Sequence, residues 1–232
     1  MTDAGRRGAR ARHAARICAL AIGLAIGLAA PEPRAEGSDA APGTALIFAT
    51  DQLAGLAPGG GLAYSLSRNV AAGSGARAIG SGAVGVTLTD TEAVVRLTED
   101  GRTRQLDPFP RAAGNPVFLV FLESALGALA DQSGGSPFYL RNRIKEAFWR
   151  GAPPEPVTAS FDGAEIAAER VVFRPFAADP HRAELGDLAG LELEFVLAPG
   201  APGRFLSLIA TTPPGAAVPF REEIRLIGET PQ

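Results

Sequence analysis

The spacing of apolar residues changes twice along this chain, and this change limits the possible folds more than any other feature. From residue 61 to residue 106 apolar and polar residues alternate, most clearly where Val84, Val86 and Leu88 are separated by glycine and threonine. A period of two is the pattern of a β-strand with one buried face. The alternation stops near residue 115 and returns at residue 157. The chain therefore predicts two groups of strands separated by a different structure.

The segment 115–150 predicts a helical hairpin inserted between the strands. A capping residue followed by proline opens each helix, at Asn115-Pro116 and again at Ser136-Pro137. The run 117–130, VFLVFLESALGALA, carries one charge, Glu123. A helix that is apolar on nearly every face is normally enclosed on several sides. We therefore expect this helix to be enclosed on several sides.

Short strands joined by tight turns predict an antiparallel sheet. The candidate strands lie at 61–68, 84–89, 93–98, 102–106, 157–161, 169–176, 191–197, 204–210 and 220–227. We predict an α+β fold, in which a curved, half-barrel-like antiparallel sheet of eight or nine strands carries the helical hairpin. Residues 61–230 would form this single β-rich domain, with the helical insert at 115–150. Residues 36–60 would be a flexible leader with a short strand at 45–49.

The N-terminus predicts an export signal. Five arginines lie within residues 1–16, and residues 17–30, ICALAIGLAIGLAA, carry no charge. This order is that of a Sec-type signal peptide, and fourteen residues fall short of the roughly 20 that cross a membrane. We expect a signal peptide over 1–35, cleavage between 30 and 40, a periplasmic location and no transmembrane anchor in the mature form. Cleavage would also remove Cys18, the only cysteine.

The charge of the predicted mature domain argues against nucleic acid as a partner. The whole chain has 22 basic and 25 acidic residues, a net charge of −3. Six of the basic and two of the acidic residues precede a cut after Ala35, which leaves 16 basic against 23 acidic residues. Proteins that bind nucleic acid normally present a basic face to the phosphates. We therefore expect no nucleic-acid partner.

The sequence offers little support for a bound nucleotide. Residues 80–85, GSGAVG, match G-x-G-x-x-G, but that motif requires a strand before it and a helix after it. Here a glycine-rich stretch precedes the motif and a strand follows it. We expect a flexible loop at 80–85 and no cofactor.

Metal and catalytic motifs are equally sparse. His181, the one histidine of the predicted mature chain, lies near Asp179, Glu184 and Asp187, and without a second histidine or a cysteine we expect a solvated loop and no metal. The carboxylates of Glu192 and Glu194 alternate with apolar residues, as on the wet side of a strand. We therefore predict no catalytic residue. A hydrolase that uses His181 stays a less favoured hypothesis, because no G-x-S-x-G turn is present to supply a nucleophile.

The second helix combines hydrogen-bond donors with aromatic side chains. Tyr139, Arg141, Arg143, Lys145 and Trp149 lie within three turns. Such a set can bind an anionic group, such as a phosphate, a carboxylate or a lipid head. The alternative is a solvated basic stripe with Trp149 packed on the sheet.

The order of elements resembles the half-barrel proteins of the bacterial envelope, in particular lipoprotein carriers of the LolA/LolB kind and related periplasmic families. The resemblance covers most of residues 60–228. It implies a sheet whose apolar cavity, partly covered by helices, takes up acyl chains. A ligand between the sheet and helix 116–130 would then contact Phe118, Phe121 and Leu122. The chain departs from this pattern in its single short hairpin and its few aromatic strand residues.

These observations favour an exported periplasmic protein without enzymatic activity. One hypothesis is that it binds a lipid or another apolar ligand between the sheet and the helix. The other is an accessory or scaffold subunit of a cell-envelope complex, which would dock through the sheet edge or the basic helix.

Overall fold

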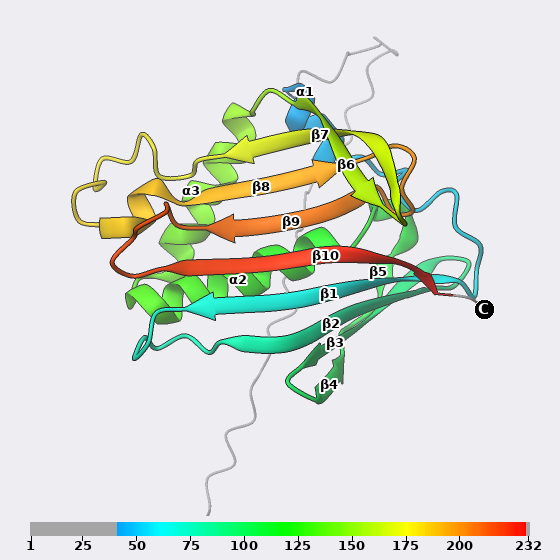
Figure 1. Ribbon diagram of the computed structural model, residues 1–232, viewed down its shortest axis with the longest axis horizontal. Coiled ribbons are helices and arrows are strands. Elements are labelled where there is room, and N and C mark those ends of the chain that lie inside the picture. Colours follow the sequence, from blue (N-terminus) through cyan, green and yellow to red (C-terminus); the bar gives the residue numbers. More distant parts are fainter. Residues whose placement is uncertain (1–40, 231–232) are drawn as a thin grey trace, which may run out of the picture. The chain divides into compact units, whose positions relative to one another are not determined.

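The computed structural model describes residues 41–230 (Figure 1). The predicted signal peptide, its cleavage site and Cys18 lie outside the described residues. The described chain combines helices with one antiparallel sheet, which confirms the α+β class. The strands are β1 (Gly61–Val70), β2 (Ile79–Leu88), β3 (Glu92–Glu99), β4 (Arg102–Gln105), β5 (Phe109–Pro110), β6 (Glu155–Phe161), β7 (Ala164–Phe173), β8 (Glu192–Leu197), β9 (Phe205–Thr211) and β10 (Phe220–Thr230).

The sheet is open and has ten strands, one more than the upper number predicted. Its order is β4-β3-β2-β1-β10-β9-β8-β7-β6, and β5 pairs with β3. Every candidate strand between residues 61 and 227 coincides with a strand of this sheet, and β5 is the addition. The first and last long strands, β1 and β10, lie side by side at the centre, paired from Gly61 opposite Thr230 to Val70 opposite Phe220. This pairing joins the two groups of strands into one sheet.

Two long helices, α2 (Val117–Ser133) and α3 (Pro137–Arg150), form the predicted hairpin. Both lie on the same face of the sheet, behind it in Figure 1. Gly134, with a φ of 65°, ends α2, and Gly151, with a φ of 74°, ends α3. Glycine adopts this left-handed conformation without the steric cost of a Cβ atom, which explains why each helix stops there.

The prediction of a strand at 45–49 is wrong. This segment belongs to a short helix, α1 (Pro42–Ile47), in which proline occupies the first turn, where its missing N–H costs nothing. The helix is tied to the end of α3, since the Gly43 N–H donates to the Ala152 carbonyl over 3.2 Å. Ile47 and Leu53 are buried in the core. The described part of the expected flexible leader, residues 41–60, therefore packs against the domain.

The prediction of a flexible loop at 80–85 is also wrong, because these residues lie within β2. Gly82 sits between the two neighbouring strands, and a Cβ atom there would lie 3.0 Å from the carbonyl oxygens of both Leu66 and Thr98. Gly82 thus allows close strand packing within β2. The sequence pattern missed this because glycine normally weakens a strand.

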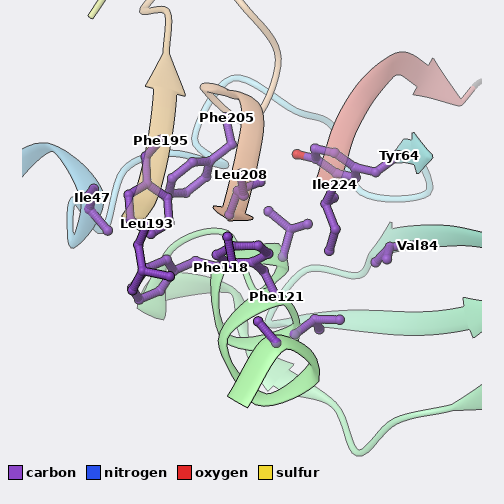
Figure 2. Packing of buried hydrophobic residues seen from close by; sticks show 14 of the residues in the cluster. Ile47, Tyr64, Val84, Phe118, Phe121, Leu193, Phe195, Phe205, Leu208 and Ile224 are labelled. Atoms are coloured by element: carbon purple, nitrogen blue, oxygen red, sulfur yellow. The ribbon is translucent and has the colours of Figure 1, made fainter. Parts of the chain in front are cut away.

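A cluster of phenylalanine rings fills the space between α2 and the sheet (Figure 2). Phe118 and Phe121 of α2 point at the sheet, where Phe195 of β8 and Phe205 of β9 face them. The ring centroids of Phe118 and Phe195 lie 5.6 Å apart, those of Phe121 and Phe195 lie 5.8 Å apart, and those of Phe118 and Phe205 lie 6.1 Å apart. These separations are those of aromatic rings in direct contact. The sheet thus covers one side of this apolar helix, while Leu119 and Glu123 on another side stay exposed.

Asn115 fixes the position at which α2 begins. Its side-chain amide donates to the Tyr64 hydroxyl over 2.8 Å and to the Gly203 carbonyl over 2.9 Å. Its side-chain oxygen Oδ1 accepts the N–H of Val117 over 3.2 Å. All of these groups are buried, and a buried polar network of this kind is stable only when its members are paired. The network therefore specifies where α2 enters the sheet.

An ion pair is enclosed in the same core. Arg68 of β1 is 7% exposed and Glu222 of β10 is fully buried, and Nε of Arg68 lies 2.5 Å from Oε2 of Glu222. Arg68 also donates to the hydroxyl of Ser124 on α2. Burial raises the pKa of the Glu222 carboxyl, while the neighbouring Arg68 charge works in the opposite direction. The pair thus links the two central strands to α2.

Removing one member of this pair should cost far more than removing both. Arg68→Met leaves the Glu222 carboxylate buried without its counter-charge, and we expect a loss of about 3–5 kcal/mol of unfolding free energy in urea at neutral pH. The double variant Arg68→Met/Glu222→Leu replaces both charges with apolar groups and should recover most of that loss. If the double variant is as unstable as Arg68→Met, the loss of stability does not come from leaving the Glu222 carboxylate without its counter-charge.

Candidate functional site

The residues predicted to bind an acyl chain lie in the packed core. Phe118 and Phe121 are buried in contact with the strand rings, and Leu122 is half-buried beside them. An acyl chain between α2 and the sheet would have to displace rings that already touch. A small open hollow of about 250 Å³ lies elsewhere, and none of the predicted site residues lines it. Its lining includes Asn69, Val70, Thr212, Pro214 and Phe220.

Two of the cations predicted to bind an anionic group are paired with carboxylates of the protein itself. Arg141 of α3 lies 3.0 Å from Glu123 of α2. Arg143 lies 2.7 Å from Glu146 on the same helix and 3.3 Å from Asp179. The pairs with Glu123 and Glu146 are exposed to solvent and contribute little to stability, but each places a carboxylate beside the cation. An external anion would have to compete with these carboxylates.

Tyr139 and Arg143 meet the loop before β8 at a buried carboxylate, Asp179. The Tyr139 hydroxyl donates to Oδ1 of Asp179 over 2.6 Å, and the backbone N–H of His181 donates to the same atom over 2.8 Å. The Arg143 guanidinium lies over the Tyr139 ring, 5.2 Å from its centroid, which is a cation–π geometry. We call Tyr139, Arg143 and Asp179 the loop clamp, because they fasten this loop to α3.

The solvated loop expected around His181 is therefore wrong in one respect, since Asp179 is buried. Burial alone would raise the pKa of the Asp179 carboxyl. The hydrogen bonds from Tyr139 and from the backbone of His181, together with the Arg143 charge, outweigh that effect and lower it. His181 itself is 57% exposed at its side chain, with Nδ1 3.5 Å from Glu184. No local pattern indicates this burial, because the side chain that donates to Asp179, Tyr139, lies 40 residues earlier.

The outer face of α3 carries large aromatic side chains in contact with solvent. Trp149 is 85% exposed and Phe138 is 74% exposed, so the alternative in which Trp149 packs on the sheet is wrong. Phe138, Asn142, Lys145 and Trp149 follow each other at helical spacing, which places them on one side of the helix. The opposite side is buried and consists of Leu140, Ile144, Ala147 and Phe148. We call Phe138, Asn142, Lys145, Trp149 and the adjacent Arg150 the α3 outer face.

The cations of the α3 outer face are free, unlike Arg141 and Arg143. Within residues 41–230, neither Lys145 nor Arg150 forms an ion pair. Four of the six large apolar side chains exposed in this part of the chain lie on the helical side: Phe48, Leu119, Phe138 and Trp149. The sequence interpretation included Lys145 and Trp149 but missed Phe138 and Arg150. The eleven-residue spacing of Phe138 and Trp149, opposite the apolar stripe of α3, is the signal that could have identified this face.

On the outer surface of the sheet, by contrast, several charges of β7, β8 and β10 pair with each other. Glu194 lies 2.7 Å from Arg170, and Glu192 lies 2.7 Å from Arg174. The prediction that both glutamates lie on the wet side of their strand is confirmed. These carboxylates are thus occupied in surface ion pairs.

Three further findings complete the description of the site. Residues 41–230 contain no group of three or more His, Cys, Asp or Glu side chains that could hold a metal ion. None of the helices in this range is long and apolar enough to cross a membrane. Comparison of the sequence with protein-family models and with curated proteins gives no match to either.

The loop clamp should make the stability of the protein depend on pH under acidic conditions. An unfolded aspartate titrates near its ordinary value of 3.8, and the folded Asp179 titrates lower. Its stabilising contribution is therefore complete above pH 3.8 and is lost as the pH falls through the lower folded pKa. Asp179→Asn removes this contribution, so we expect its Tm to lie below that of the wild type at neutral pH, with the gap narrowing in acid. Thermal unfolding from about pH 6 to about pH 2.5 measures this, and a constant gap would contradict it.

The two aromatic environments should respond differently to truncation. Phe121→Ala creates a cavity in the core and should cost about 3–5 kcal/mol of unfolding free energy. Trp149→Ala removes an exposed side chain and should change it by less than about 0.5 kcal/mol. Urea unfolding of both variants tests this, and a large loss in Trp149→Ala would show that Trp149 packs against the protein.

Proposed function

We propose that the protein is a non-enzymatic accessory protein of the bacterial cell envelope that attaches to another envelope component through the α3 outer face. The observation that carries this proposal is the exposure of Trp149 and Phe138 on one side of a helix. Covering a large aromatic side chain removes apolar surface from water and is favourable, so exposed aromatic side chains often mark a binding surface. Tryptophan in particular is enriched at binding surfaces.

The way in which α3 is held supports a role in attachment. Its inner side is buried, Arg141 connects it to Glu123 of α2, and the loop clamp fastens it to the loop before β8. The helix is thus fixed on three sides while its outer face stays uncovered. A rigid element with exposed anchors loses little conformational entropy when it binds.

The packed core favours a surface over an interior cavity as the functional element. The rings of Phe118 and Phe121 occupy the place where carriage of an acyl chain would need space. Among residues 41–230, no side chains cover Trp149 and Phe138 of the α3 outer face in this way. Attachment through the α3 outer face therefore requires no rearrangement of the core, whereas binding of an acyl chain between α2 and the sheet does.

The N-terminal sequence supports the location. A basic stretch followed by fourteen uncharged residues directs a chain to export, and the periplasm is where such a protein would meet envelope components. The proposal thus combines a periplasmic destination with one uncovered surface.

Fractionation of cells tests this proposal. The full chain, expressed with its own N-terminal segment in a bacterium with two membranes, should sediment with the envelope. The double variant Phe138→Ser/Trp149→Ser should move largely to the soluble fraction, because both anchors are lost. The matched control is Ile227→Ser, which removes a side chain that is 65% exposed on β10, away from the helices.

The control should stay with the envelope like the wild type. If the double variant sediments as the wild type does, the α3 outer face does not mediate attachment and the proposal is wrong. Circular dichroism of both variants verifies that each is folded.

A further inference from the structure

We infer that the envelope component bound by the α3 outer face is the surface of an anionic lipid bilayer. This inference rests on the proposed function and names the partner that the face fits. Three observations support it: the placement of the aromatic anchors, the free cations beside them and the acidic charge of the rest of the domain.

The aromatic anchors are placed for a helix that lies flat on a membrane. Phe138 and Trp149 are eleven residues apart, which is about 17 Å along a helix, and they share one side of it. Both rings can therefore reach the same depth below the lipid head groups when the helix axis lies parallel to the surface. Aromatic side chains, tryptophan above all, favour this interfacial zone.

The charges of the face are complementary to anionic head groups. Lys145 lies between the two aromatic anchors and Arg150 follows Trp149, and neither forms an ion pair within residues 41–230. Lysine and arginine side chains place their stems along apolar surface while the charged ends stay with the head groups. Each cation near an anionic surface adds to the attraction.

The rest of the domain is acidic, which orients it on such a surface. Six of the 22 basic residues and four of the 25 acidic residues lie before residue 41, so residues 41–232 carry 16 basic against 21 acidic side chains. An anionic bilayer repels this excess and attracts unpaired cations. Within residues 41–230 β4 also carries such cations, at Arg102 and Arg104, but only those of α3 stand beside exposed aromatic anchors. The domain should therefore approach the membrane with α3 first.

A lipid surface fits this face better than a protein partner or a second copy of the chain does. Stable protein interfaces bury about 1,200–2,000 Å² around a central cluster of anchors. Here the two aromatic side chains stand at opposite ends of the helix, with the polar side chains of Asn142 and Lys145 between them. A fluid lipid surface accepts separated anchors because it needs no matching shape.

The chain contains its own probe for this inference, because Trp149 is its only tryptophan. The full chain is mixed with vesicles of phosphatidylglycerol and phosphatidylethanolamine, and with vesicles of phosphatidylcholine alone. With the anionic vesicles, the emission of Trp149 should shift to shorter wavelength and should be quenched by lipids with brominated acyl chains. With phosphatidylcholine, the apparent partition should be at least about tenfold weaker, because the charge contribution is absent. The emission reports on α3 alone, whatever the N-terminal segment binds.

Two charge-reversal variants provide a matched comparison. Lys145→Glu/Arg150→Glu should weaken partition into the anionic vesicles by at least about tenfold. The control, Arg102→Glu/Arg104→Glu, reverses two exposed cations of the edge strand β4 and should partition as the wild type does. Both variants change the net charge equally, so the difference between them measures the position of the cations.

Several results would overturn the inference. An unchanged Trp149 emission with anionic vesicles would do so, as would equal losses in the two charge-reversal variants. A blue shift that grows with protein concentration in the absence of lipid would assign the face to a second copy of the chain. If envelope attachment depends on Phe138 and Trp149 while the vesicles have no effect, the proposed function stands and the lipid partner is wrong. If envelope attachment is independent of both residues, the proposed function itself fails.

Discussion

The contact between the rings of α2 and those of the sheet is the interaction on which the other features depend. Phe118 and Phe121 pack against Phe195 and Phe205, and each ring pair adds about 0.5–1.5 kcal/mol to the gain from burial alone. This contact seats α2 on the sheet, and Phe148 of α3 joins the same cluster, with its ring centroid 5.8 Å from that of Phe118 and 4.8 Å from that of Phe173 on β7. Because the apolar side of α3 turns toward this cluster, the opposite side of the helix faces solvent.

The polar groups of the core specify this arrangement where apolar contacts would tolerate others. Asn115 sets the start of α2 against Tyr64, and the Arg68–Glu222 pair holds Ser124 over the junction of β1 and β10. Apolar side chains can slide past each other with little loss, whereas a displaced buried charge or amide loses its partner. The two surfaces of the domain also differ in how their charged side chains are paired. Glu192 and Glu194 on the outer surface of the sheet are paired with arginines, whereas Lys145 and Arg150 of the α3 outer face form no ion pair within residues 41–230.

The sequence predicted the parts of this protein that depend on local periodicity. The alternation at Val84, Val86 and Leu88 located a strand, and the pairs Asn115-Pro116 and Ser136-Pro137 located the helix starts, because these signals act within a few residues. It missed what depends on distant partners: the central pairing of β1 with β10, the strand formed by 80–85 and the burial of Asp179 against Tyr139. Of the candidate site, the composition of α3 identified the helix. Its exposed side emerged only once the fold showed which residues the sheet and α2 cover.

The claim that the core is filled, so that binding belongs to the surface, is tested most directly by hydrogen–deuterium exchange of the full chain. The amides of α2 should be among the slowest to exchange, and a saturating amount of a long-chain fatty acid should leave their rates unchanged, because no space exists between the rings and the sheet. Rapid exchange throughout α2 would contradict the account. So would exchange between Val117 and Ser133 that slows when fatty acid is added, since that would show a lipid taking the place of the rings.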